Sequence, residues 1–205
     1  MADHDSYRVH DREVWQGIFR AIPKDWYAAP ASNAMEEARR YLGDCAGPIL
    51  DLGCGFGRWA TYLASSNGAP LVGMDYAAEG VRAAKAWSTR RGQALTWVTG
   101  DVLRLPFARA TFTGVLAALI LDNLSRDDMP EAVAEATRVV GAGGYGFFVF
   151  NPSSYAPAAA ADNPTRGCMH VVYSDAELLL ALPGWSLSAI RTSAEGFRLI
   201  EGRRN

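Results

Sequence analysis

The stretch "ILDLGCGFGRWA", residues 49–60, decides the fold of this 205-residue chain. Its first four residues are typical of the end of a buried strand, and an apolar helical pattern follows the last glycine. Between the two, Gly53, Gly55 and Gly57 stand at alternate positions. A glycine loop between a strand and a helix brings backbone close to a ligand, so the stretch predicts a binding site.

Strand and helix patterns alternate along the chain around this loop. The expected strands are 49–52, 71–74, 95–99, 112–119, 145–150, 185–191 and 196–202, and the expected helices are 11–21, 32–42 (capped by Ser32-Asn33), 57–66, 77–90, 127–140 (ended by the "GAGG" at 141–144) and a short one opened by Ser174 and Glu177. This alternation predicts an α/β fold with a Rossmann-like sheet and helices on both faces. The terminal strand pair predicts a seven-stranded, mainly parallel sheet in the order 3-2-1-4-5-7-6, with strand 7 antiparallel.

No internal repeat or linker divides the chain, which predicts a single domain over residues 1–205. Within it we expect an N-terminal helical segment over 1–45 and a ligand-binding core over 46–150. Residues 151–205 would supply a long loop, a helix and a terminal hairpin. The loop, 151–172, holds three prolines and little periodicity, and loops of this length are usually functional.

Composition excludes several classes of function. A net charge of −2 with 20% charged residues gives no broad basic field, so no nucleic-acid partner is expected. The three cysteines lack metal-ligand spacing and form no disulfide framework, which indicates free thiols in a reducing compartment and no metal. No run approaches the ~18 apolar residues of a membrane span, and no apolar leader is present. We expect a cytoplasmic protein, monomeric or homodimeric, with no membrane contact.

The glycine loop departs from the dinucleotide fingerprint G-x-G-x-x-G, because Arg58 occupies the place of its third glycine. No Gly-Lys-Ser/Thr follows, which excludes a nucleotide-triphosphate loop. A tight structural turn is the plain alternative. Asp51, directly before the loop, would repel a phosphate and attract a ligand that carries an ammonium group.

Acids at the ends of two further strands extend the site. Asp75 ends the second strand, where a carboxylate accepts bonds from the hydroxyls of a ribose, although it could also cap the helix over 77–90. Tyr76 is placed to lie against a base, and Asp101 ends the third strand, where it could accept from the amine of adenine. The inferred ligand has an amino-acid end, a ribose and an adenine but no phosphate, which describes S-adenosylmethionine.

Four motifs in fixed order over residues 49–150 then carry a family resemblance. They are "LDLGCGFGRWA", "VGMDYA", "GDVLRLPFARATFTGVLAALIL" and "EATRVVGAGGYGFFVF". The chain resembles the class I S-adenosylmethionine-dependent methyltransferases, most closely the type 11 group that acts on small molecules. The resemblance implies transfer of a methyl group to a small-molecule acceptor. It assigns Asp51, Gly53, Cys54, Gly55 and Gly57 to the methionine part of the cofactor, Asp75 to the ribose, Tyr76 to the adenine face, Asp101 and Val102 to the adenine edge, and Ala118 and Leu119 to the sulfonium.

Methyl transfer from a sulfonium mainly requires alignment and removal of water, with a base where the acceptor carries a proton. Where many members of the family have a His pair after the fourth strand, this chain has Asp122-Asn123. The candidate catalytic residues are His170, Tyr173 and Asp122, each with a structural role as the alternative. We also expect Trp15–Tyr27 and the long loop to close over an apolar or aromatic acceptor.

Two other functions stay open on the sequence. A nicotinamide-dependent oxidoreductase shares the ribose acid, but Arg58 and the terminal hairpin count against it. A non-enzymatic methyltransferase-like subunit would keep the fold without turnover, which the intact cofactor positions disfavour. Binding of S-adenosylmethionine rather than NAD would separate the first from a methyltransferase, and a stable partner without turnover would indicate the second.

Overall fold

The computed structural model describes residues 4–21, 29–65, 68–155 and 168–205. The helices are α1 (His4–Arg20), α3 (Asn33–Leu42), α4 (Arg58–Leu63), α5 (Ala78–Arg90), α6 (Asp128–Val139) and α7 (Asp175–Leu180), with a 3-10 helix η1 (Leu121–Asn123). The strands are β1 (Ile49–Leu52), β2 (Leu71–Asp75), β3 (Thr96–Thr99), β4 (Phe112–Ala118), β5 (Val140–Phe150), β6 (Trp185–Leu187), β7 (Arg191–Thr192) and β8 (Arg198–Arg204). Within these ranges no helix is long and apolar enough to cross a membrane.

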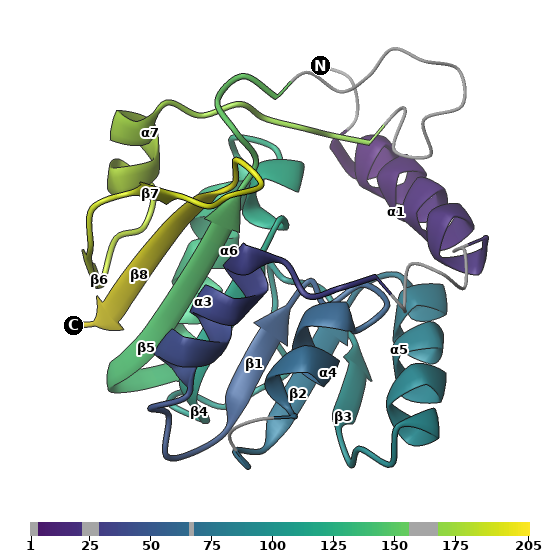
Figure 1. The fold of residues 1–205 in the computed structure, drawn as a ribbon. Coiled ribbons are helices and arrows are strands. Elements are labelled where there is room, and N and C mark those ends of the chain that lie inside the picture. Colours follow the sequence, from purple (N-terminus) through teal and green to yellow (C-terminus); the bar gives the residue numbers. More distant parts are fainter. Residues whose placement is uncertain (1–3, 22–28, 66–67, 156–167) are drawn as a thin grey trace.

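The strands form one mixed sheet in the order β3-β2-β1-β4-β5-β8-β6 (Figure 1), with β7 also paired to β8. The first five strands run parallel, and β8 is antiparallel to β5, β6 and β7. The expected order and the antiparallel strand are confirmed. The strand expected at 185–191 is split into β6 and β7. Between them, the Ser188 hydroxyl accepts from the Glu201 amide at 3.1 Å, where a backbone carbonyl would accept in a regular pair of strands.

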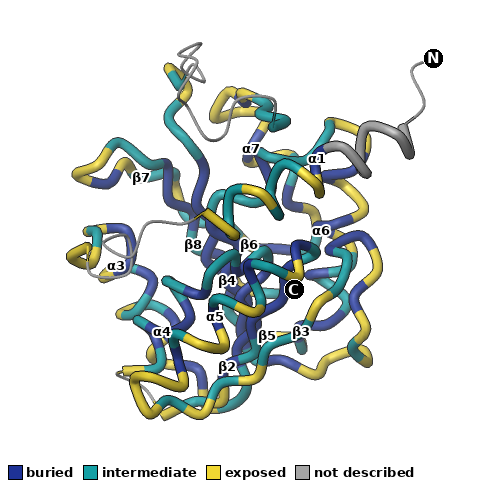
Figure 2. Tube along the Cα trace, turned by 90° about the vertical axis from the view of Figure 1, so that its right-hand side faces the viewer, coloured by how far each residue is buried: buried dark blue, intermediate teal, exposed yellow. Residues whose placement is uncertain are grey.

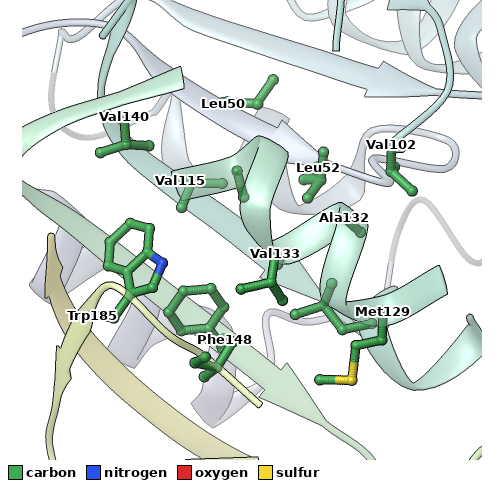
Figure 3. Close-up of a cluster of buried hydrophobic side chains, with 14 of the residues drawn as sticks. Leu50, Leu52, Val102, Val115, Met129, Ala132, Val133, Val140, Phe148 and Trp185 are labelled. Carbon is green, nitrogen blue, oxygen red and sulfur yellow. The ribbon is translucent and has the colours of Figure 1, made fainter. Parts of the chain in front are cut away.

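Two layers of helices cover the sheet. Side chains of α3 and α4 pack on one face, where α5 also contacts β2 and β3, and α6 and α7 cover the other. Leu50 and Leu52 of β1 and Phe148 of β5 meet Met129 and Val133 of α6 in the second layer (Figure 3). The sheet is the buried centre of the chain, and exposed residues gather on the outer sides of the helices (Figure 2).

Two expected helix starts are confirmed at the level of single hydrogen bonds. The Ser32 hydroxyl accepts from the Met35 amide at 3.2 Å and caps α3. Ser174 and Glu177 form a reciprocal capping box at the start of α7. These short polar patterns fix the entry of the chain into both helices.

Several expected boundaries were wrong. Helix α1 begins at His4 rather than at residue 11, since the charged residues before 11 give no apolar periodicity. Helix α4 ends at Leu63. The "GAGG" segment forms no turn between helix and strand, because α6 passes directly into β5 at Val140. Gly144 is needed for close packing, as a Cβ there would come 2.4 Å from Val140 Cγ1, and Gly143 has a left-handed backbone with a φ of +72°.

Candidate active site

A cavity of about 310 Å³ opens at the carboxyl ends of β1, β2 and β4, the edge at which open α/β sheets bind ligands. Nine of the eleven predicted cofactor-binding residues line it: Gly53, Cys54, Gly55, Asp75, Tyr76, Asp101, Val102, Ala118 and Leu119. The remaining lining residues are Asp11, Trp15, Phe19, Phe56, Arg58, Trp59, Ile120, Asn123, Leu124, Ser125 and Asp128. The sequence therefore located the cavity, and the walls are mainly aromatic and aliphatic.

The glycine loop has a left-handed backbone at all three expected positions. The φ angles of Gly53, Gly55 and Gly57 are +70°, +51° and +80°, a region in which side chains are strained. A Cβ on Gly53 would lie 2.6 Å from Ile120 Cγ1, so the loop touches the chain that leaves β4. Gly57 does not line the cavity. It lets the start of α4 approach β3, since its Cβ would lie 2.5 Å from the Trp97 ring.

Asp51 lies beneath the loop, outside the cavity lining, with 1% of its surface exposed. Its carboxylate accepts from the Ala60 amide at 3.1 Å, which holds the first turn of α4. Burial raises the pKa of Asp51 to about 7, although the bond from Ala60 opposes this shift. The contact with the methionine part of a cofactor stays a prediction, and the structural role is the one described here.

Asp75 lines the cavity at the end of β2 and also holds two backbone amides. Its Oδ2 accepts from Gly55 at 2.9 Å and its Oδ1 from Ala77 at 2.8 Å. Each carboxylate oxygen keeps a second lone pair, so the group can still accept bonds from a pair of ribose hydroxyls. Burial raises the pKa of Asp75 to about 6. Both sequence interpretations of this residue, ligand contact and local cap, are compatible with this geometry.

Tyr76 is held from the side of α1. Its hydroxyl donates to the Asp11 carboxylate, and the Arg12 guanidinium lies 5.4 Å from the centre of its ring. Burial, together with the bond to Asp11, raises the pKa of the Tyr76 phenol. The Tyr76 ring is therefore held in one orientation at the cavity, and its hydroxyl stays protonated. Two residues after the end of β3, Asp101 accepts from the Leu103 amide at 3.0 Å and lines the cavity beside Val102.

The end of β4 carries a strained residue. Leu119 lines the cavity with a φ of +56°, which costs about 1–2 kcal/mol for a residue with a side chain. Its amide donates to the Val149 carbonyl at 2.9 Å, and its carbonyl accepts from the Asn123 side chain at 2.6 Å. These two bonds hold the backbone in a conformation that it would otherwise leave.

The three candidate catalytic residues gather beside the cavity, and none of them lines it. Asp122 is buried and accepts from the Asn151 amide and side chain at 2.8 and 2.9 Å. His170 Nδ1 lies 3.5 Å from the Asn123 side-chain oxygen, and Asn123 does line the cavity. Within the described ranges, Asp122 Oδ1 and the Tyr173 hydroxyl are buried without a partner. The group is thus a polar cluster behind the cavity wall, in which Asp122 and Tyr173 are buried and His170 is half-buried.

Burial shifts the titration of this cluster. It lowers the pKa of His170, against the pull of the Asp122 charge, and it raises the pKa values of Asp122 and Tyr173. A neutral His170 can accept a proton at neutral pH. Across the described part of the chain, no group of three or more His, Cys, Asp and Glu side chains could hold a metal ion.

Residues from α1 are the main part of the site that the sequence did not assign. Asp11, Trp15 and Phe19 line the cavity at a spacing of four residues, which puts them on one side of the helix. Trp15 and Phe19 lie within the segment 15–27 that the sequence predicts as a cover for the acceptor, whereas Asp11 lies outside it. The four-residue spacing puts Asp11 on the same side of α1 as these two rings, but it does not indicate the partners of Asp11, which are distant in the sequence. Trp26, Tyr27 and the centre of the long loop lie outside the described residues.

Part of the chain is similar in sequence to known methyltransferases. Residues 49–144 match the family model described as a methyltransferase domain. The 2-phytyl-1,4-naphtoquinone methyltransferase of Thermosynechococcus vestitus is 37% identical over 97 residues, which cover 46% of this chain and 42% of that protein. The ubiquinone/menaquinone biosynthesis C-methyltransferase of Paracoccus denitrificans is 35% identical over 127 residues, which cover 62% of this chain and 46% of that protein. The chain thus spans less than half the length of either relative.

The fold has solved counterparts as well. The 1,6-didemethyltoxoflavin-N1-methyltransferase of Burkholderia thailandensis, solved with 1,6-didemethyltoxoflavin and S-adenosylhomocysteine bound, matches with a TM-score of 0.78. The match covers 100% of this chain and 92% of that one at 17% identity, so the likeness concerns the fold. Together these matches confirm the resemblance of residues 49–144 to methyltransferases and the Rossmann-like fold around them.

Proposed function

We propose that this chain transfers the methyl group of S-adenosylmethionine to a small-molecule acceptor. The observation that carries the proposal is the cavity at the strand ends, which joins a left-handed glycine loop to the strand-end carboxylates Asp75 and Asp101. When bound there, S-adenosylmethionine supplies a methyl group that its sulfonium already activates. The residues present fit such a group, because the backbone of Gly53 and Gly55 and the carboxylates of Asp75 and Asp101 all line the same cavity.

The described residues would divide the work as follows. Asp75 accepts from the ribose, and Tyr76 and Asp101 hold the base. The left-handed Leu119 shapes the wall where donor and acceptor meet. His170, oriented through Asn123, takes up a proton where the acceptor must lose one. Asp122 orients the backbone around His170, since its carbonyl accepts from the Val171 amide at 2.8 Å.

The acceptor that suits this cavity is apolar or aromatic. Trp15, Phe19, Phe56, Trp59 and Leu124 line the walls. Rings of this kind bind flat, unsaturated molecules and keep water from the reacting atoms. The names of the relatives support the same class, because one of them acts on a naphthoquinone. We further propose that the protein works in the cytoplasm as a monomer or homodimer and without nucleic acid.

Calorimetry with S-adenosylmethionine, S-adenosylhomocysteine and NAD tests the proposal directly. We expect the first two to bind and NAD not to bind. Incubation with methyl-labelled donor and pools of small aromatic molecules then identifies the acceptor by the product that carries the label. Binding of NAD alone would overturn the proposal in favour of an oxidoreductase. Donor binding with a stable protein partner and no labelled product would support a non-enzymatic subunit.

A further inference from the structure

One buried carboxylate joins three parts of the site that are far apart in the sequence. Asp11 of α1 is 7% exposed and lines the cavity. Its Oδ2 accepts from the hydroxyl of Tyr76, at the end of β2. Its Oδ1 accepts from the Met169 amide at 3.4 Å, in the segment that precedes α7. Tyr76 directly follows Asp75, and Met169 directly precedes His170.

Helix α1 itself is anchored on the cofactor side. The Gln16 side chain accepts from the Glu79 amide at 3.2 Å, and Arg20 forms an ion pair with Glu79 at 3.4 Å. Figure 1 shows α1 above α5, at the edge of the sheet where the parallel strands end. Asp11 is therefore carried by an element that is fixed to the start of α5, and its carboxylate cannot shift toward one of its two partners without straining the bond to the other.

We propose that Asp11 is a positioning residue that couples the cofactor site to the acceptor side. Its carboxylate holds the Tyr76 ring in the cavity for the adenine and, through the same group, fixes the backbone beside His170. A ligand that packs against Tyr76 strengthens the whole set of bonds, so donor binding orders the segment over 168–171 before the acceptor enters. This inference rests on the proposed binding of S-adenosylmethionine and adds a residue and an order of binding to it.

Hydrogen–deuterium exchange with and without S-adenosylhomocysteine tests the coupling. In the wild type the ligand should slow amide exchange in β2 and α5 and also in residues 168–173. In Tyr76→Phe, which keeps the ring and removes the hydroxyl, we expect protection of β2 and α5 to remain and protection of 168–173 to be lost. Equal protection of 168–173 in the wild type and in this variant would overturn the proposal.

Calorimetry supplies the second readout. Asp11→Ala and Tyr76→Phe should each weaken S-adenosylhomocysteine binding about five- to tenfold, and the double variant should be no weaker than the weaker single one, because both remove the bond between Tyr76 and Asp11. Glu13→Gln, an exposed acid on the same helix, is the matched control and should bind like the wild type. Additive losses in the double variant would show that the two residues act independently. Absence of binding to the wild type would instead overturn the proposed function itself.

Discussion

Phe19 of α1 lies directly against Gly55 of the glycine loop. A Cβ on Gly55 would come 3.1 Å from Phe19 Cζ, and a Cβ on Gly80 would come 2.8 Å from Phe19 Cδ2. Two glycines from different parts of the chain thus let one aromatic ring pack closely against the backbone. The N-terminal helix, which the sequence predicts as a cover for the acceptor, is therefore also in contact with the glycine loop and with the first turn of α5.

Substitution of Gly55 tests the contact between Phe19 and the glycine loop. Gly55→Ala should lower the free energy of unfolding by about 1–2 kcal/mol, because alanine is strained at positive φ, and should also weaken S-adenosylhomocysteine binding by displacing Phe19. Gly68→Ala is the matched control. Gly68 has a similar φ of +61° with nothing within 4 Å, so this variant should lose stability alone. Denaturant unfolding and calorimetry measure the two effects, and unchanged affinity in Gly55→Ala would contradict the prediction.

Removal of the strand-end acid should cost both binding and stability. Asp75→Ala takes away a buried charged acceptor from the ribose and from the Gly55 and Ala77 amides. We expect donor affinity to fall roughly ten- to more than a hundredfold, and the free energy of unfolding to drop by about 1–3 kcal/mol. Asp44→Ala, at an exposed acid, should change neither quantity. Donor affinity that survives in Asp75→Ala would refute the ribose assignment.

Donor binding should depend on pH through the same residue. The pKa of Asp75 is raised to about 6, so its carboxylate becomes protonated as the pH falls through that value. Protonation removes an acceptor and a negative charge that attracts the cationic donor. Calorimetry between pH 5 and 8 should show affinity that declines on the acid side in the wild type. In Asp75→Asn the affinity should be weak and nearly constant with pH.

The raised pKa of Asp51 should make its contribution to the free energy of unfolding fall with rising pH, whereas donor affinity should rise. Its pKa is raised to about 7 in the folded protein, above the ~3.9 of an unfolded chain. The folded state therefore binds the proton more tightly, and this group removes stability progressively as the pH rises from about 4 to about 7. Asp51→Asn should gain stability relative to the wild type over that window and keep a constant advantage above it. Thermal unfolding of both proteins across the range measures the difference, which a pH-independent offset would contradict.

His170 should affect turnover and leave donor affinity unchanged. If it accepts the acceptor's proton, His170→Ala lowers kcat by about a hundredfold or more. The wild-type rate should also fall at acid pH, below the ordinary pKa of histidine, because burial lowers the pKa of this ring. Asn123→Ala, which removes its 3.5 Å neighbour, should lower kcat by less. Full turnover in His170→Ala with the acceptor found by labelling would remove the residue from the mechanism.

Local patterns were enough to predict the sheet and most of the cavity. Strand ends and glycine loops can be predicted from a linear sequence because neighbouring residues determine them. Asp75 and Asp101, which the sequence places at strand ends, line the cavity in the structure. Asp11 was not predictable in this way, since its partners Tyr76 and Met169 are 65 and 158 residues away. The direct passage of α6 into β5 was missed because glycines usually end helices, whereas residues 141–144 here lie within β5, where Gly144 is required for close packing.

Leu119 gives a consequence for redesign of the site. A glycine would accept the left-handed backbone at this position without strain and would take a side chain out of the cavity wall. Leu119→Gly loses side-chain contacts, which usually lowers stability when a pocket is enlarged. Here the loss is offset by the relief of about 1–2 kcal/mol of backbone strain. Leu119→Gly should therefore widen the cavity for bulkier ring systems at a reduced cost in fold stability.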